Sequence, residues 1–335
     1  MILATADNGK PDGHLLVVAS NRQVAADASA IAATLQDALD RWEIVEAELL
    51  ALAARLDAGQ VSTARPLAGW NLLAPLPRAW QWLDGSAFAQ HGDLMAEAFH
   101  QPPIDAGMPL MYQGLSHRFI APTEDVSFLH EADGIDFEGE FGILVDAVPM
   151  GTTAEQAPGH IRLLVQINDW SLRRLAPVEM KTGFGWIVAK PACSMAPFAL
   201  TPDELGPLWS RQRVQATLVV ERNGERFGTV PATEMGLGFD ALVAHAAATR
   251  DLCAGTIIGS GTVSHSGYRE HGSCCIAERR AIEMIDNGGN ASTAYLRFGE
   301  RVRMVAQGPG AGDALFGEID QMAVRREPGV KPTLR

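Results

Sequence analysis

The stretch Gly134-Ile-Asp-Phe-Glu-Gly-Glu-Phe-Gly-Ile-Leu-Val-Asp146 combines the pattern of a buried strand with two carboxylates, Glu138 and Glu140. Side chains alternate between the two faces of a strand, so residues two apart point the same way. Two carboxylates on one face of an apolar strand repel each other, and burial adds a desolvation cost. A bound Mg²⁺ or Ca²⁺ ion, which prefers oxygen ligands, would offset both effects. A solvated strand face is the alternative.

The composition indicates a soluble enzyme-sized chain without an affinity for polyanions. It has 335 residues, of which 47% are hydrophobic, and a net charge of −13. This length suits one large domain and a small one. The negative charge and the lack of a basic block exclude nucleic acid and anionic membrane surfaces as expected partners. The N-terminus has neither the basic start nor the apolar stretch of a signal peptide, so we expect a cytoplasmic protein.

The four cysteines show no C-x-x-C spacing. They are Cys193, Cys253, Cys274 and Cys275. We expect reduced thiols, as in most cytoplasmic proteins, and neither a zinc site nor a disulfide framework.

The first part of the chain predicts a small domain. Residues 13–20 predict a strand, and residues 25–57 carry apolar residues at helical spacing, which predicts one long helix or two short ones. Proline and glycine are frequent over residues 58–80, which indicates a linker. We therefore predict an N-terminal domain over residues 1–75, acting as a cap or a dimerisation element, and a larger domain over residues 76–330.

The larger domain is predicted to be rich in strands. Helices are expected over residues 87–99 and 239–252, and elsewhere short apolar runs are separated by Gly, Pro and Asp. Runs of this number and length are typical of a β-rich barrel or sandwich. The predicted strands cover residues 141–148, 161–168, 185–189, 214–221, 227–230, 256–264, 276–285 and 294–305.

Two further acidic elements accompany the glutamate pair. Asp169 follows an apolar strand in Asn168-Asp-Trp-Ser171, where a carboxylate is suited to a third metal ligand. Asp84 precedes a predicted helix, in which His91 would lie about two turns later on roughly the same face. A helix cap or turn aspartate and a surface histidine are the alternatives.

Two elements could hold an anion. Lys190 follows four apolar residues, so its side chain either reaches back to solvent or lies beside a negative group. The small-residue loop over residues 259–267 follows a predicted strand and could cradle an oxyanion with backbone N–H groups. It matches neither a Walker loop nor a dinucleotide fingerprint.

The order of these elements resembles the fumarylacetoacetate hydrolase family over roughly residues 70–330. The resemblance rests on Leu73-Ala-Pro-Leu-Pro77, Asp84 with His91, Pro109-Leu-Met-Tyr112, the two glutamates, Asn168–Ser171, Lys190 and Gly261-Thr-Val-Ser264. The preceding residues resemble the small N-terminal domain of bacterial members. The family implies an α+β, β-rich fold with a mixed, rolled sheet or barrel, usually as a homodimer.

The resemblance also implies a set of site residues. The implied ligands of a Mg²⁺ or Ca²⁺ ion are Asp84, Glu138, Glu140 and Asp169. His91 corresponds to the general base, Glu278 to the carboxylate that orients it, and Lys190 to the lysine beside the metal. Tyr112, Thr262 and Ser86 correspond to substrate-contacting positions. The animal enzymes carry a tyrosine in place of Ser86 and a glutamine in place of Ala176, so the acyl group that this chain accepts stays open.

The implied reaction is hydrolysis of a C–C bond in a 1,3-diketo acid. With fumarylacetoacetate it would yield fumarate and acetoacetate, at the end of tyrosine or homogentisate breakdown. His91 would deprotonate the attacking water, and the cation would accept enolate charge. The alternatives are a fumarylpyruvate or other acylpyruvate hydrolase, and a hydratase or decarboxylase acting on 2-oxo-dienoates. Those last relatives usually lack the spacing of Asp84 and His91. A metal-stabilised binding protein without turnover is a further alternative.

Overall fold

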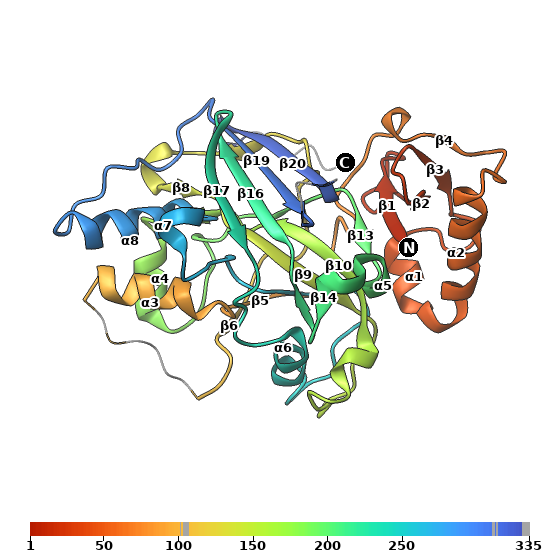
Figure 1. Cartoon of the computed structure of the whole chain (residues 1–335), viewed down its shortest axis with the longest axis horizontal. Coiled ribbons are helices and arrows are strands. Elements are labelled where there is room, and N and C mark those ends of the chain that lie inside the picture. Colours follow the sequence, from red (N-terminus) through yellow and green to blue (C-terminus); the bar gives the residue numbers. More distant parts are fainter. Residues whose placement is uncertain (101, 103–106, 310–311, 313, 330–335) are drawn as a thin grey trace.

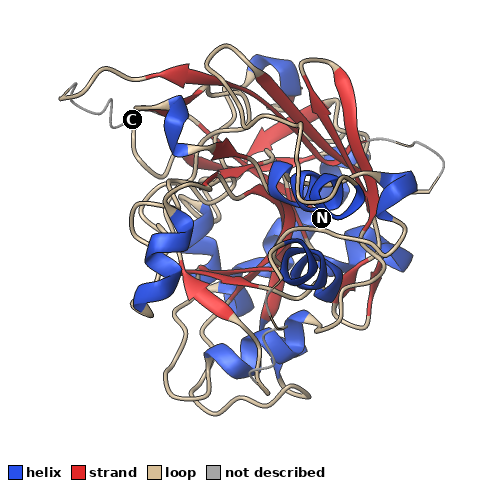
Figure 2. Cartoon of the chain, turned by 90° about the vertical axis from the view of Figure 1, so that its left-hand side faces the viewer, coloured by secondary structure: helices blue, strands red, loops and turns tan. Residues whose placement is uncertain are grey.

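The computed structural model describes residues 1–100, 102, 107–309, 312 and 314–329. A long mixed sheet and a five-stranded sheet, in which four antiparallel strands are joined by one parallel edge strand, form the framework (Figure 1). Figure 2 shows the strands running through the middle of the molecule, with helices around them. The helices are α1 (Leu35–Asp40), α2 (Trp42–Asp57), α3 (Ala89–Ala98), α4 (Ala176–Thr182), α5 (Pro202–Leu205), α6 (Phe239–Ala246), α7 (Tyr268–His271) and α8 (Ile276–Asp286).

The strands of the long sheet lie in an order that differs from their order in the chain. From edge to edge they are β4 (Arg65–Pro66), β3 (Val24–Asp27), β2 (His14–Val18), β1 (Ile2–Ala6), β13 (Ala199–Leu200), β10 (Ile161–Asn168), β9 (Gly139–Val145), β18 (Thr256–Gly259), β5 (Trp82–Gly85) and β6 (Met111–Gln113). β12 (Ser194–Met195) also pairs with β10. β5 and β18 run parallel, whereas β9 and β10 are antiparallel.

The second sheet contains the strands that lie later in the chain. Its order is β17 (Glu225–Pro231), β16 (Thr217–Arg222), β19 (Arg301–Gln307), β20 (Ala314–Arg325) and β7 (Val126–Phe128). Two short pairs complete the strands: β8 (Ile135–Asp136) with β11 (Ser171–Leu172), and β14 (Trp209–Ser210) with β15 (Arg213–Val214).

Apolar side chains of β9 fill both faces of the long sheet. Phe141 and Ile143 belong to a first core cluster, which includes Leu218 of β16 and therefore joins the two sheets. Leu144, which follows Ile143 in the alternation, belongs to a second cluster on the opposite face. Because β9 is buried on both faces, its sequence is an almost continuous apolar run.

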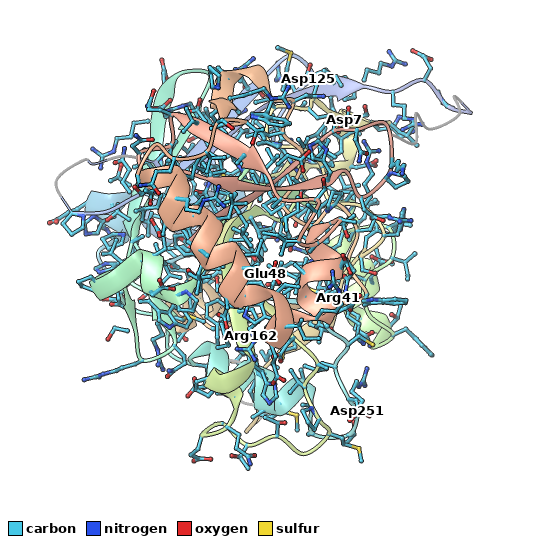
Figure 3. All side chains as sticks on the ribbon, turned by 90° about the vertical axis from the view of Figure 1, so that its right-hand side faces the viewer. Asp7, Arg41, Glu48, Asp125, Arg162 and Asp251 are labelled. Atoms are coloured by element: carbon cyan, nitrogen blue, oxygen red, sulfur yellow. The ribbon has the colours of Figure 1, made fainter. Side chains whose placement is uncertain are left out.

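Helices α1 and α2 cover the second cluster. Trp42 and Leu49 of α2 are buried there with Val17 of β2. Arg41 and Glu48 lie on the outer side of this helical layer (Figure 3). The helical spacing within residues 25–57 is thus confirmed as two helices, preceded by a strand that the helical pattern concealed.

The N-terminal strands are part of the long sheet. β1 pairs antiparallel with β13, with Ile2 opposite Leu200. Within the predicted linker, β4 pairs with β3, and Leu72 forms a bridge with Ala6. The segment is therefore packed against the N-terminal strands, and the domain boundary at residue 75 stays a prediction.

The α+β, β-rich fold class predicted from the sequence is confirmed, with sheets that stay open and do not close into a barrel. Two predicted strands are wrong. Residues 276–285 form α8, because Ile276, Ala277, Ala281 and Ile282 bury one face at helical spacing, and a short apolar run does not separate helix from strand. Residues 185–189 form an irregular, largely exposed segment. Among the described residues, no helix has the length and apolar character that a membrane span requires.

Candidate active site

Three carboxylates meet where neighbouring strands of the long sheet end. Asp84 lies on β5, Glu140 on β9, and Asp169 directly after β10. Each offers an oxygen, and these oxygens lie within 4.8 Å of one another. All three side chains are buried. We call these residues the acidic cluster.

Strand alternation explains why the acidic cluster forms. Trp82 and Ile167 both belong to the second core cluster, and each precedes its aspartate, Asp84 or Asp169, by two positions. Both aspartates therefore point to the same face of the sheet. Glu140 is paired directly with Ile167, and paired residues of adjacent strands share a face. The acidic cluster therefore lies on the same face of the sheet as the apolar side chains that α1 and α2 cover.

The acidic cluster is electrostatically unsatisfied without a cation. Burial, and then the negative charge of Asp169, raises the pKa of Asp84 well above its ordinary value. Burial and the charge of Asp84 do the same to the pKa of Glu140. Among the described residues, neither carboxylate oxygen of Glu140 has a hydrogen-bond partner. Buried oxygens without a donor, grouped with two more carboxylates, fit a hard divalent cation.

Glycines in the loop after β18 make room for this cluster. A Cβ at Gly259 would lie 2.3 Å from Asp84 Oδ1, so only glycine fits beside that carboxylate. Gly261 has a φ of +76°, in the left-handed region, and its N–H donates to Asp84 Oδ1 at 3.1 Å. The small-residue loop singled out in the sequence therefore holds a carboxylate in the structure.

Glu138 lies next to the acidic cluster but is held by donors of its own. Its Oε1 accepts from Lys190 Nζ at 2.7 Å and from Ser171 Oγ at 2.6 Å, and it pairs with Arg173 at 2.8 Å. Its Oε2 accepts from the Thr262 hydroxyl. Although burial opposes it, the charges of Arg173 and Lys190 hold the pKa of Glu138 well below its ordinary value. Its role as a fourth metal ligand stays a prediction.

Lys190 links Glu138 to the acidic cluster. Its Nζ also donates to Asp169 Oδ2 at 2.6 Å, and the Tyr112 hydroxyl donates to the same oxygen at 2.6 Å. Burial opposes the charged ammonium, but Asp169 and Glu138 together raise the pKa of Lys190 above its ordinary value. Lys190 is therefore a cation at neutral pH.

Ser86 follows β5 with an exposed side chain whose hydroxyl has no partner among the described residues.

His91 and Glu278 face each other from two packed helices. His91 Nδ1 lies 2.9 Å from Glu278 Oε2, with Glu278 fully buried and the histidine side chain 18% exposed. The two helices pack through the small apolar cluster Leu94, Ala98, Ala281 and Ile282. These residues lie three, four or seven positions after His91 or Glu278, so the packed faces of α3 and α8 also carry the pair.

The His91–Glu278 pair leaves one ring nitrogen available. Because Glu278 accepts at Nδ1, that nitrogen carries the proton, and Nε2 keeps its lone pair. The backbone N–H of Gly139 donates to the carbonyl oxygen of Cys274 at 2.9 Å, and Glu138 forms a bridge with Cys275, the N-cap of α8. The helix that carries Glu278 therefore begins beside the start of β9, the strand that carries Glu140.

Two residues of this site were missed from the sequence. Arg173 Nε donates to Asp136 Oδ2 at 2.8 Å and also pairs with Glu138. Asp136 in turn accepts from the backbone N–H groups of Ile276 at 2.7 Å and Ala277 at 2.9 Å, the first residues of α8. The sequence does contain a signal for Asp136, because this residue lies two positions before Glu138 in the same alternating strand pattern.

Asp136→Ala is expected to lower the free energy of unfolding by about 3 kcal/mol or more, because Arg173 and two N–H groups of α8 lose a buried acceptor. Urea unfolding measures the effect. Asp136→Asn, which keeps one acceptor oxygen, should lose less. Equal stability of Asp136→Ala and the native chain would show that the acceptor does not anchor α8.

Divalent metal is expected to raise the melting temperature, and more so at neutral than at acid pH. Because the pKa values of Asp84 and Glu140 are raised, these two groups bind more protons in the folded metal-free chain than in the unfolded chain. Their contribution to the free energy of unfolding therefore falls as the pH rises above about 4, and a cation offsets that loss. Melting curves with Mn²⁺ and with EDTA, at neutral pH and at about pH 4.5, measure the difference. If metal raises the melting temperature equally at both pH values, the effect does not come from the charges of Asp84 and Glu140.

Two family models match the chain. The one described as fumarylacetoacetate (FAA) hydrolase C-terminal matches residues 81–316, and fumarylacetoacetase N-terminal domain 2 matches residues 1–78. The chain belongs to the fumarylacetoacetate hydrolase family. Members of this family are enzymes, among them hydrolases and isomerases. No curated protein matched the chain.

Solved structures share the fold at low sequence identity. An HpcE-type protein from Mycobacterium smegmatis has a TM-score of 0.68 at 17% identity, covering 98% of this chain and 100% of its own. A 2-hydroxyhepta-2,4-diene-1,7-dioate isomerase from Mycobacterium abscessus reaches 0.66 at 17% identity, with the same coverage. Maleylpyruvate hydrolase from Sphingobium sp. SYK-6, in complex with manganese(II) and pyruvate, reaches 0.63 at 17% identity, again covering 98% and 100%. These similarities establish that the chain has the same fold as these solved structures, and they leave its substrate open.

Proposed function

We propose that this chain is a divalent-cation-dependent hydrolase that cleaves a C–C bond of a 1,3-diketo acid, with fumarylacetoacetate as its substrate. The observation that carries the proposal is the pairing of His91 with a buried Glu278 at 2.9 Å, on a helix that begins beside the strand carrying Glu140 of the acidic cluster. A cation-binding protein without turnover would not need an oriented histidine. The products would be fumarate and acetoacetate, as in tyrosine or homogentisate breakdown.

His91 would act as the general base and then as the acid. Its Nε2 takes a proton from a water molecule, and the Glu278 carboxylate stabilises the imidazolium that results. The water oxygen forms a bond to the substrate carbonyl carbon. As the tetrahedral alkoxide collapses, the C–C bond breaks and its electron pair passes to the departing enolate. The imidazolium then gives its proton to the enolate carbon at which the C–C bond broke. The products are a methyl ketone and a carboxylic acid.

Oxyanions in this reaction would be stabilised by Lys190. Two of the three N–H bonds of its ammonium are directed to Glu138 and Asp169, so the third remains for a substrate oxygen. A divalent cation held by Asp84, Glu140 and Asp169 supplies a Lewis acid for the developing enolate charge. Mg²⁺, Ca²⁺ and Mn²⁺ all suit this oxygen donor set, and a solved relative is described with manganese(II).

A second candidate is an acylpyruvate hydrolase. A solved structure of the same fold is named maleylpyruvate hydrolase and holds pyruvate. In this chain, Ser86 stands where the resemblance places a tyrosine of the animal enzymes, and its exposed hydroxyl leaves the acyl position open. The two candidates share the cation, His91 and the bond that breaks, and they differ in the group on the far side of the scissile bond.

A substrate comparison tests the proposal. Loss of diketo-acid absorbance is followed with fumarylacetoacetate, fumarylpyruvate and a 2-oxo-dienoate, each with Mn²⁺, with Mg²⁺ and with EDTA. We expect cation-dependent consumption of fumarylacetoacetate at the highest kcat/KM. A higher value for fumarylpyruvate selects the second candidate. Conversion of the 2-oxo-dienoate alone would contradict C–C hydrolysis.

We also propose that the enzyme is a homodimer, with the segment over residues 176–188 in the interface. This segment exposes Val178, Met180, Phe184, Ile187 and Val188, of which Phe184 is 97% exposed. Exposed apolar groups of this density are typical of association surfaces. We expect light scattering to give twice the chain mass of 35.9 kDa, and Phe184→Asp to give the monomer. A native monomer would contradict the proposal.

A further inference from the structure

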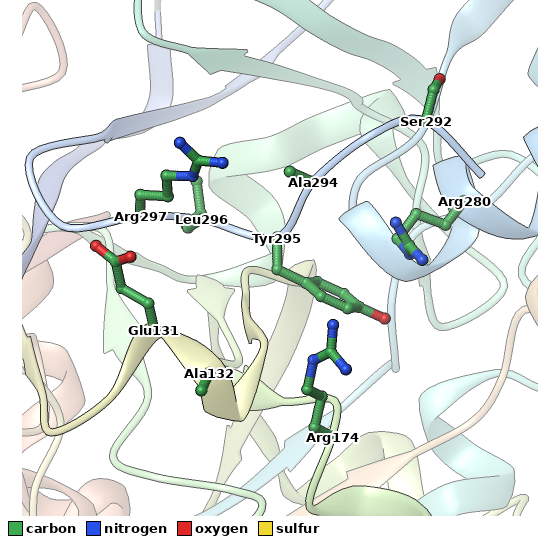
Figure 4. A pocket seen from close by; sticks show the side chains of 9 residues that line it. All are labelled: Glu131, Ala132, Arg174, Arg280, Ser292, Ala294, Tyr295, Leu296 and Arg297. Atoms are coloured by element: carbon green, nitrogen blue, oxygen red, sulfur yellow. The ribbon is translucent and has the colours of Figure 1, made fainter.

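Two adjoining surface hollows are lined by arginine side chains that the proposed reaction does not use. Their volumes are about 540 and 470 Å³, and Ala294 lines both. Arg174, Arg280 and Arg297 line the first hollow, shown in Figure 4, and Arg222, Arg226 and Arg279 line the second. We call the pair of hollows the arginine pocket.

The arginine pocket is positive in a chain that is strongly negative. The whole chain has 27 basic residues against 40 acidic ones. Within the pocket, six arginines are opposed by two acidic residues, Glu131 and Glu225. Glu131 Oε1 already accepts from the backbone N–H of Phe298 at 2.7 Å. Glu300, outside the lining, pairs with Arg222 at 2.8 Å, which leaves five arginines against two acidic residues, so a small anion is still attracted to this surface.

Three of the guanidinium groups are fixed in place before any ligand arrives. Arg280 lies 4.9 Å over the ring of Tyr295 and donates to the carbonyl oxygen of Thr293. Arg279 lies 4.7 Å over the ring of Phe227 and donates to the carbonyl oxygen of that residue at 2.7 Å. Arg222 forms an ion pair with Glu300 at 2.8 Å. Donors that are already oriented lose less conformational entropy when a ligand binds.

The remaining three arginines have free donor groups. Among the described residues, the side chains of Arg174, Arg226 and Arg297 form no hydrogen bond or ion pair. Figure 4 shows the Arg174 guanidinium directed toward the ring of Tyr295, with Arg280 on the other side of that ring. Free guanidinium groups lie in both hollows, and their planar donor groups match carboxylate and phosphate oxygens.

We infer that the arginine pocket binds a small molecule with two oxyanion groups, phosphate or carboxylate, one in each hollow. Each hollow offers at least one free guanidinium beside an anchored one, whereas a single anion would engage only half of the donors. The inference does not depend on the proposed hydrolysis, because no lining residue belongs to the acidic cluster or to the His91–Glu278 pair. Arg279 and Arg280 do lie on α8, the helix that carries Glu278.

Calorimetry at constant ionic strength tests the inference. Butane-1,4-diol bisphosphate, succinate and inorganic phosphate are titrated into the full chain. We expect saturable binding of the bisphosphate or of succinate, about tenfold or more tighter than phosphate, because a second group binds intramolecularly. The tighter of these two ligands identifies the preferred oxyanion. The double substitution Arg174→Ala with Arg297→Ala should weaken it about tenfold or more.

Arg55→Ala, on the exposed end of α2, is the matched control and should leave the affinity unchanged. Because Arg174 and Arg297 are exposed, the double variant should keep the native melting temperature, which separates lost binding from lost folding. Three results would overturn the inference: no saturable binding of the bisphosphate or of succinate, binding of both no tighter than that of phosphate, or an affinity that the double substitution leaves intact. The last result would place the anion elsewhere, for instance beside Lys190.

Discussion

Glu140→Gln is expected to weaken divalent-cation binding by about a hundredfold or more, since even residues that only support a metal ligand change affinity by about 10–100-fold when replaced. Both carboxylate oxygens of Glu140 are buried without a donor, so the charge at this position has no other evident use among the described residues. Titration calorimetry with Mn²⁺ measures the loss. The substitution keeps the shape of the side chain and removes one negative charge.

The same substitution separates a metal site from a structural role. Without metal, the neutral amide removes the repulsion between position 140 and Asp84, so the melting temperature should stay equal or rise. Glu48→Gln, on the outer face of α2, is the control and should change neither quantity. Native Mn²⁺ affinity in Glu140→Gln would show that the acidic cluster is not the cation site.

His91→Asn is expected to lower kcat by about 10²- to 10⁴-fold while leaving Mn²⁺ affinity unchanged, because general-base catalysis contributes factors of this size. His91 hydrogen-bonds Glu278, and among the described residues it forms no hydrogen bond with the acidic cluster. Glu278→Gln should lower kcat as well, because an amide at Oε2 no longer fixes the Nδ1–H tautomer. His117→Asn, an exposed histidine whose side chain has no hydrogen-bond partner in the described part of the chain, is the control.

The pH profile gives an independent readout for His91. If His91 is the base, the acid limb that the native enzyme shows in kcat/KM at saturating Mn²⁺ should disappear in His91→Asn. A variant that keeps its acid limb and most of its turnover would assign the proton transfer to another group.

Much of the site could be predicted because each part carries a local sequence signal. Asp169 follows a predicted apolar strand and Glu140 belongs to the strand-like stretch that was singled out first, whereas β5, the strand that carries Asp84, was not predicted from the sequence. His91 and Glu278 are 187 positions apart, and only the resemblance suggested that they meet. The structure supplies the physical reason, which is the packing of α3 on α8 through residues at helical spacing from each.

The sequence did not predict what surrounds Glu138. It was grouped with Glu140 because residues two apart in a strand share a face, but β9 begins at Gly139, and Glu138 lies just before it. There it forms ion pairs with Lys190 and Arg173. Both residues lie later in the chain, and only the folded structure shows that they pack beside Glu138. Asp136 was missed for the same reason, since its partners are backbone groups of α8, which was itself predicted as a strand.

The central claim is that one site joins a cation bound by the acidic cluster to a base, His91, for C–C hydrolysis. The most direct measurement is steady-state consumption of fumarylacetoacetate by the native enzyme, after EDTA treatment and after Mn²⁺ is restored, with product analysis for fumarate and acetoacetate. We predict turnover that EDTA abolishes and Mn²⁺ restores, with both acids formed in equal amounts. Turnover that survives complete removal of metal, or consumption of the substrate without cleavage into the two acids, would contradict the claim.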